Sequence, residues 1–112
     1  MCFDRCKIHG FELNFFQSNI EGLLIDEIHK AINDGAGIII NAGALTHTSI
    51  GILDALNMFK GPKIEIHITN VHARESFRHK SYISPVASGI IAGLGVNSYL
   101  LAIEALQNLI ND

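Results

Sequence analysis

Two ionisable residues alternate along an apolar stretch in the middle of the chain. Glu65 and His67 lie two positions apart in a segment predicted to be a strand over residues 63–69, so their side chains share one face with Thr69. A carboxylate that hydrogen-bonds an imidazole fixes its tautomer and raises its basicity. A buried His–Glu pair with a purely structural role is the alternative. His67 and Thr69 also fall at the carboxyl end of the predicted strand, which favours a general acid held by a carboxylate.

A second polar group follows the apolar strand predicted for residues 37–41. That strand ends at Asn41, and the small residues Ala42-Gly43-Ala44 lead to His47. Small residues after a strand let a ligand approach the backbone. A plainer interpretation is a connecting loop in which Thr48 or Ser49 caps the next helix. The two interpretations are compatible, but the plainer one leaves His47 unexplained.

Residues 70–87 form the longest irregular segment, and they carry a pair of arginines. Long loops inside small domains are usually functional. Arg74 and Arg78 are four positions apart, so they face the same way if the segment is locally helical. A guanidinium group can bind hydroxyls or a carboxylate through its planar fork. For Arg74, an exposed charge pair is an equally good interpretation.

Other polar residues point to weaker hypotheses. A metal site could combine His47, Glu65, His67 and His72, but no H-E-x-x-H motif is present, so we expect no metal. No glycine-rich phosphate loop follows a strand, which argues against a nucleotide or flavin cofactor. The remaining candidates have ordinary interpretations as surface groups or small buried groups: Asp54 on a predicted helix, His9, His29, His79, Cys2 and Cys6.

The apolar pattern predicts the elements that position these residues. Strands are expected over residues 11–16, 37–41, 63–69 and 88–94, and helices over residues 49–59 and 97–110. A first helix is expected to follow a capping box, Ser18 to Glu21, and to stop at Asp34-Gly35. Alternating strands and helices predict a doubly wound α/β domain with a parallel sheet. In such sheets ligands bind at the carboxyl ends of the strands. A domain of this pattern usually has five strands, and four are found.

Composition limits the class of protein. The chain has 112 residues, of which 48% are hydrophobic and 17% charged, with a net charge of -3. One domain over residues 1–112, without internal linkers, is expected. The charge argues against nucleic-acid partners, which need a clustered basic face. No apolar run is long enough for a membrane span, and residues 1–6 lack the apolar core of a signal peptide, so the cytoplasm is the expected compartment.

Several motifs lie in order along nearly the whole chain. They are Phe16-Gln17-Ser18-Asn19 with Glu21-Gly22, Ile40-Asn41-Ala42-Gly43-Ala44 with Thr46-His47-Thr48-Ser49, the run from Ile64 to Glu75, Phe77-Arg78, the run from Ser81 to Pro85, Gly93-Leu94-Gly95 and Tyr99. Together these motifs closely resemble type II 3-dehydroquinate dehydratase.

The resemblance implies a flavodoxin-like fold and a cofactor-free lyase that assembles as a dodecamer built from trimers. Its reaction is the anti elimination of water from 3-dehydroquinate to 3-dehydroshikimate, through an enolate, in the shikimate or quinate pathway. His67 matches the general acid, Glu65 the residue that orients it, and Asn41 a substrate-binding neighbour of both. The remaining binding positions are Ile68 and Thr69 for the substrate carboxylate, His47 and Arg78 for ring hydroxyls, and Asp54 for the site of a neighbouring subunit.

The chain departs from the family pattern at its start. The family begins with a strand, an N-G-P-N-L-N motif, and a lid that carries an arginine and the tyrosine that abstracts the proton. None of these has a counterpart here, Met1 to Gly10 resembles the helix after the lid, and neither Tyr82 nor Tyr99 replaces the base. The missing strand would be the central one of the order 2-1-3-4-5. We therefore expect an impaired, N-terminally truncated dehydratase. One alternative is a non-catalytic relic or subunit that binds dehydroquinate-like acids or joins an oligomer. Another is an unrelated flavodoxin-like domain.

Overall fold

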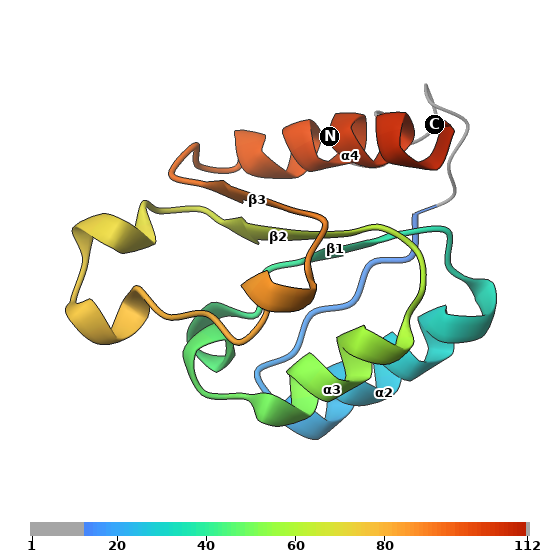
Figure 1. The fold of residues 1–112 in the computed structure, drawn as a ribbon, viewed down its shortest axis with the longest axis horizontal. Coiled ribbons are helices and arrows are strands. Elements are labelled where there is room, and N and C mark those ends of the chain that lie inside the picture. The colour runs from blue at the N-terminus through green and yellow to red at the C-terminus, as the bar shows by residue number, and fades with distance from the viewer. Residues whose placement is uncertain (1–12, 112) are drawn as a thin grey trace.

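A parallel sheet of three strands lies at the centre of the computed structural model, which describes residues 13–111 (Figure 1). The strands are β1 (Ile38–Ile40), β2 (Lys63–His67) and β3 (Gly89–Ala92), in the spatial order β1-β2-β3. In the register, Glu65 lies between Ile40 of β1 and Ile90 of β3. β2 is therefore paired on both sides, and all five of its residues are buried.

Helices cover both faces of this sheet. Helices α2 (Glu21–Asp34) and α3 (Ile50–Met58) pack together on one face, and α4 (Asn97–Asn111) crosses the other (Figure 1). One apolar core, which includes Ile40, Ile52 and Leu56, fills the α2–α3 side. A second core joins residues of β2 to α4. The predicted doubly wound α/β class is confirmed.

The two helix starts differ in how well they were predicted. Ser49 caps α3 as expected, because its Oγ accepts a hydrogen bond from the Ile52 N–H at 2.9 Å. The capping box predicted for α2 is wrong. The N-cap is Ile20, and the Ser18 Oγ accepts from the Ile20 N–H at 3.0 Å, before the helix begins. Ser18 thus closes a local turn, and Glu21 is the first helical residue.

The strand predicted for residues 11–16 is not formed in its described part, residues 13–16. A strand exists only where its backbone bonds a neighbour, and within residues 13–111 β1 pairs with β2 alone. Several expectations lie outside the described residues. They concern Cys2, Cys6, His9, residues 11–12 and the family helix that Met1 to Gly10 resembles. The expectation that a central strand is missing lies outside them as well.

Side chains alternate along β2 and divide its residues between the two layers. Ile64 and Ile66 belong to the core on the α4 side. Glu65 and His67 therefore point to the opposite face. Lys63 is buried as well, and its Nζ donates hydrogen bonds to the carbonyl oxygens of Leu56 (3.1 Å) and Phe59 (2.6 Å), where α3 ends. The ammonium group thus satisfies carbonyls that a helix end leaves unpaired.

β2 ends two residues earlier than predicted, and the chain then follows the edge of the sheet. The Gly93 N–H donates to the His67 carbonyl at 3.1 Å, and the Gly95 N–H to that of Ile68 at 2.9 Å. Gly93 has a φ of 86°, and a Cβ there would lie 3.3 Å from the Asn70 Cβ, so the position favours glycine. Residues 70–87 hold only short 3₁₀ helices, η2 (Val71–Ala73), η3 (Ser76–Arg78) and η4 (Ser84–Val86).

None of the helices within residues 13–111 combines the length and the apolarity that crossing a membrane requires.

Candidate active site

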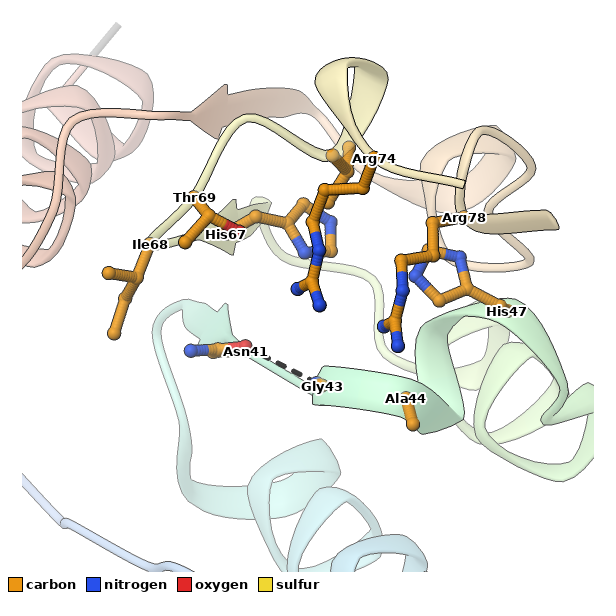
Figure 2. A pocket seen from close by; sticks show the side chains of 10 residues that line it. Asn41, Gly43, Ala44, His47, His67, Ile68, Thr69, Arg74 and Arg78 are labelled. Atoms are coloured by element: carbon orange, nitrogen blue, oxygen red, sulfur yellow. Dashed lines mark hydrogen bonds between the residues drawn. The ribbon is translucent and has the colours of Figure 1, made fainter. Parts of the chain in front are cut away.

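A cavity of about 280 Å³ opens at the carboxyl ends of β1 and β2 (Figure 2). Its volume is near the lower end of the range for small-molecule sites, about 300 Å³. Six residues predicted from the sequence line it: Asn41, His47, His67, Ile68, Thr69 and Arg78. Arg74 and the small residues Gly43 and Ala44, which the sequence analysis also noted, line it too, as does Val71. The chain therefore brings most of the predicted residues to one place.

Glu65 and His67 form the buried end of this site. The His67 Nε2 lies 2.6 Å from the Glu65 Oε2, and the exposed fractions of the two residues are only 6% and 1%. Glu65 does not line the larger cavity but lies behind His67, where both residues border a smaller cavity of about 50 Å³. The predicted contact is thus present, and only His67 of the pair reaches the larger cavity.

Two serines also bind the Glu65 carboxylate. The Ser81 Oγ donates to Oε2 at 2.8 Å, and the Ser84 Oγ donates to Oε1. Burial raises the pKa of Glu65, but the hydrogen bonds from His67, Ser84 and Ser81 together outweigh it, so the net pKa lies below its ordinary value. The carboxylate is therefore ionised at neutral pH and accepts every hydrogen bond that it makes.

An ionised carboxylate determines which imidazole nitrogen of His67 carries a proton. Because Glu65 only accepts, the His67 Nε2 is the donor in their 2.6 Å contact. Nδ1 is then the nitrogen left for other chemistry. When both nitrogens are protonated, Nδ1 can donate a proton, and Glu65 stabilises the imidazolium cation that carries it. The arrangement is that of an imidazole held by a buried carboxylate, with its second nitrogen not engaged by Glu65.

His47 lines the same cavity, but here Nδ1, not Nε2, makes the hydrogen bond to the rest of the protein. Its Nδ1 lies 2.8 Å from the Lys80 carbonyl oxygen, which can only accept, so Nδ1 carries a proton. The rings of His47 and His67 lie 6.3 Å apart and are nearly parallel, at 16°. His47 ends the 3₁₀ helix η1 (Gly43–His47), directly after β1. The Nε2 of His47 is left to bind a polar group.

Asn41 is held at both ends of its amide. Its Oδ1 accepts from the Gly43 N–H, and its Nδ2 donates to the Tyr99 hydroxyl, both at 3.2 Å. Gly43 has a φ of 57°, a left-handed conformation that glycine adopts without strain. The Tyr99 contact comes from α4, across the end of the sheet. Asn41 is thus a preorganised polar group at the cavity wall.

The two arginines bring positive charge to the cavity from the segment after β2. Figure 2 shows both guanidinium groups projecting toward the side of Asn41 and Ala44. The Arg78 Nε donates to Glu75 at 2.7 Å, which leaves its terminal nitrogens for a ligand. Hydrogen bonds from its own backbone and from Arg78 lower the pKa of Glu75. The carbonyl of Arg74 accepts from the His79 ring at 3.1 Å.

The other predicted residues divide between the cavity and the surface. Ile68 and Thr69 line the cavity, but the Ile68 side chain points away from the guanidinium groups, so its backbone is the polar part it can offer (Figure 2). Asp54 is exposed on α3 and is not among the residues that line either cavity. Within residues 13–111, no group of three or more His, Cys, Asp or Glu side chains is arranged to hold a metal ion.

Sequence reasoning missed the groups that orient the site residues. These are Ser81 and Ser84 on Glu65, the Lys80 carbonyl on His47 and the Tyr99 hydroxyl on Asn41. Backbone carbonyls carry no sequence signal. The serines stand in a run, Ser81-Tyr82-Ile83-Ser84-Pro85, that is typical of a hydroxyl-capped turn. That pattern could have drawn attention to the serines, but it does not indicate which carboxylate they bind.

The chain is similar to known dehydroquinases along most of its length. The family model described as Dehydroquinase class II matches residues 1–107. A 3-dehydroquinate dehydratase of Cereibacter sphaeroides is 55% identical over 89% of this chain and 68% of its own length. "3-Dehydroquinate dehydratase 2" of Agrobacterium fabrum is 59% identical over the same shares. The crystal structure of type II dehydroquinase from Propionibacterium acnes superposes with a TM-score of 0.91 at 37% identity, over 96% of this chain and 74% of that one.

The contacts of the two histidines predict opposite neutral tautomers. In its neutral form, His67 should be protonated at Nε2 and His47 at Nδ1. Long-range ¹H–¹⁵N correlation spectra of the imidazole rings distinguish the two forms. The exposed His29 on α2 provides a reference within the same spectrum. A His67 protonated at Nδ1 would contradict the donor role of Nε2 toward Glu65.

Proposed function

The chain belongs to the class II dehydroquinase family, and we propose that its cavity binds 3-dehydroquinate for dehydration to 3-dehydroshikimate, in the shikimate or quinate pathway. One observation carries the proposal most strongly. The buried Glu65–His67 pair lies at the wall of a cavity whose other lining is polar and cationic. An acid beside groups that can bind an anionic polyol is one part of what such a dehydration requires, and a base is the other.

The polar lining suits the parts of this substrate. Two guanidinium groups and a backbone edge at Ile68 and Thr69 favour an anionic carboxylate. The Asn41 amide, the His47 imidazole and the Arg78 fork can bind ring hydroxyls. A volume of about 280 Å³ suits a small ring acid better than a nucleotide. We assign the carboxylate to Ile68 and Thr69, and the hydroxyls to His47, Arg78 and Asn41.

The proposed reaction uses one acid and one base. A base removes a proton from the carbon next to the ketone, and the electrons form an enolate. The enolate then expels the hydroxyl group on the opposite face, the carbon–oxygen bond breaks, and His67 supplies the proton that completes water. Positioned acid–base groups of this kind contribute on the order of 10²–10⁴-fold each. Glu65 holds the His67 ring in place for that transfer and needs no cofactor to do so.

The base belongs to the part of the family pattern without a counterpart here. The resemblance assigns the proton-abstracting tyrosine and a lid arginine to a segment that none of these 112 residues matches. We propose that the 112-residue polypeptide retains the acid and the binding groups and turns over slowly by itself. A non-catalytic binding or assembly role is the second candidate, and the same set of binding groups around His67 supports it.

Association of several copies is part of the proposal. The resemblance implies a dodecamer built from trimers, in which Asp54 contributes to the site of a neighbouring subunit. Asp54 is exposed and is not among the residues that line the cavity of its own chain, which is compatible with that role. Large apolar side chains around β3 are also exposed: Ile90 (55%), Leu94 (54%) and Val96 (62%). Exposed apolar surface of this kind favours association.

Light scattering tests the association. We expect a molar mass that is a multiple of the 12.2 kDa mass of one chain at micromolar concentration. In the assembled form, we also expect Asp54→Asn to weaken the binding of 3-dehydroquinate without unfolding the chain. Asp26→Asn, which changes an exposed carboxylate on α2, is the matched control. A monomer at every concentration, or equal effects of the two substitutions, would contradict the proposed role of Asp54.

Calorimetric titration with 3-dehydroquinate tests the central part of the proposal. We expect saturable binding, and Arg78→Met should weaken it by about tenfold or more, because it removes charge-assisted hydrogen bonds. Lys30→Met, which removes an exposed positive charge on α2, should leave the affinity unchanged. The same samples should show little of the enone absorbance that marks 3-dehydroshikimate.

Two outcomes would count against these expectations. If the unsubstituted chain shows no saturable binding, the cavity is not a 3-dehydroquinate site. If the 112-residue polypeptide turns over at about 1–10³ s⁻¹, the range that is typical of enzymes in general, the expectation of slow turnover fails. A base must then be sought among the residues present.

A further inference from the structure

The carboxylate of Glu65 is held mainly from outside its own strand. Ser81 and Ser84, which lie 16 and 19 residues further along the chain, each donate a hydroxyl to it. Ser81 binds the same oxygen as His67, and Ser84 binds the other one. Both carboxylate oxygens are therefore occupied, and the plane of the carboxylate is fixed by contacts on both sides.

The hydroxyl of Ser81 can point only at Glu65. A hydroxyl group has one proton and two acceptor positions. The Ser81 Oγ accepts from the Ile83 N–H at 2.9 Å and from the Ser84 N–H at 3.0 Å, so both acceptor positions are filled. Its single proton remains for the Glu65 Oε2, 2.8 Å away. Ser81 is thus a donor whose direction is set before any ligand arrives.

The turn that carries the serines is anchored in the core. Ile83, between them, is completely buried and packs with the apolar residues between the sheet and α3. The Tyr82 N–H donates to the Thr46 carbonyl at 2.8 Å, which ties the turn to η1. Pro85 restricts the backbone where η4 begins. The serines cannot move away from Glu65 without disturbing this packing.

The same turn reaches the second histidine of the site. The carbonyl oxygen of Lys80, directly before Ser81, accepts a hydrogen bond from the His47 Nδ1 at 2.8 Å. The segment from Lys80 to Ser84 therefore orients both imidazoles, His47 by direct contact and His67 through Glu65. The smaller cavity beside Glu65 is lined by further titratable groups, His72, His79 and Arg78, but these have no hydrogen bond to its carboxylate among the contacts of residues 13–111.

We propose that Ser81 and Ser84 are positioning residues for the acid, which hold the Glu65 carboxylate ionised and oriented so that it fixes the His67 ring. The consequence for catalysis rests on the proposed function, since His67 acts there as the acid. Neither serine lines the larger cavity, so their effect reaches the substrate only through Glu65 and His67.

Removing one donor should make the carboxylate more basic. A buried carboxylate that loses a hydrogen bond to its charged form keeps its burial, which favours protonation. Ser84→Ala should therefore raise the pKa of Glu65, by about one unit. Ser84→Thr keeps a hydroxyl and should restore most of the original value. Ser81→Ala should raise it too, but this change also removes an acceptor of two backbone N–H groups.

Carbon-13 NMR of the Glu65 side-chain carboxyl, followed from pH 2 to pH 8 in the 112-residue chain, measures this value directly. Ser88→Ala is the matched control, because the Ser88 Oγ accepts from the Lys63 N–H on the same strand and does not contact Glu65. The proposal predicts a raised midpoint in Ser84→Ala, recovery in Ser84→Thr and no change in Ser88→Ala. An unchanged midpoint in a folded Ser84→Ala chain, or an equal shift in Ser88→Ala, would overturn it.

This titration needs no substrate and no turnover. Failure of the proposed function would appear as absent binding of 3-dehydroquinate by the unsubstituted chain, with the carboxyl titrations of the serine variants unaffected. In a folded chain, failure of the positioning role would appear in those titrations alone.

Discussion

A single buried charge determines how this site is built. Glu65 is 1% exposed, and a carboxylate removed from water is costly unless hydrogen bonds replace its hydration. Here His67, Ser81 and Ser84 supply them. Since the carboxylate stays ionised, it can only accept, and this condition decides which nitrogen of His67 carries the proton of their hydrogen bond. The requirement to satisfy one buried group thus sets the protonation of the group that we propose to do the chemistry.

The fold brings this group together from separate parts of the chain. β2 lies between two strands, and its side chains alternate. Ile64 and Ile66 therefore face α4, while Glu65 and His67 face the site. The ends of β1 and β2 place Asn41 and His67 at one edge, and the irregular segment after β2 returns with the arginines and then with the serine turn. That segment takes the place of a crossover helix between β2 and β3. Irregular backbone here supplies side chains in directions that a regular helix would not.

The sequence predicted the parts of the site that depend on local pattern. A period of two in β2 was sufficient to pair Glu65 with His67, and the strand end and the arginine spacing drew attention to Asn41, His47 and Arg78, which line the cavity. It failed where a distant neighbour decides the outcome. The alternating apolar residues before α2 resemble a strand, but residues 13–16 have no strand to pair with among the described residues. Ser18 matches a capping box, but the helix begins only at Glu21. The serine contacts span 16 and 19 residues, a distance at which no periodicity applies.

The pH dependence of stability in Glu65→Gln tests most directly whether an ionised Glu65 organises the site. The pKa of Glu65 is lower in the folded chain than its ordinary value of 4.5, so the charge stabilises the fold above that pH, and this contribution is lost as pH falls through the folded-state value. Urea unfolding at pH 7 should therefore show the variant to be less stable by about 2 kcal/mol. The difference should shrink as pH falls below 4.5. A difference that does not change with pH, or a variant that is more stable at pH 7, would contradict an ionised carboxylate at the centre of the site.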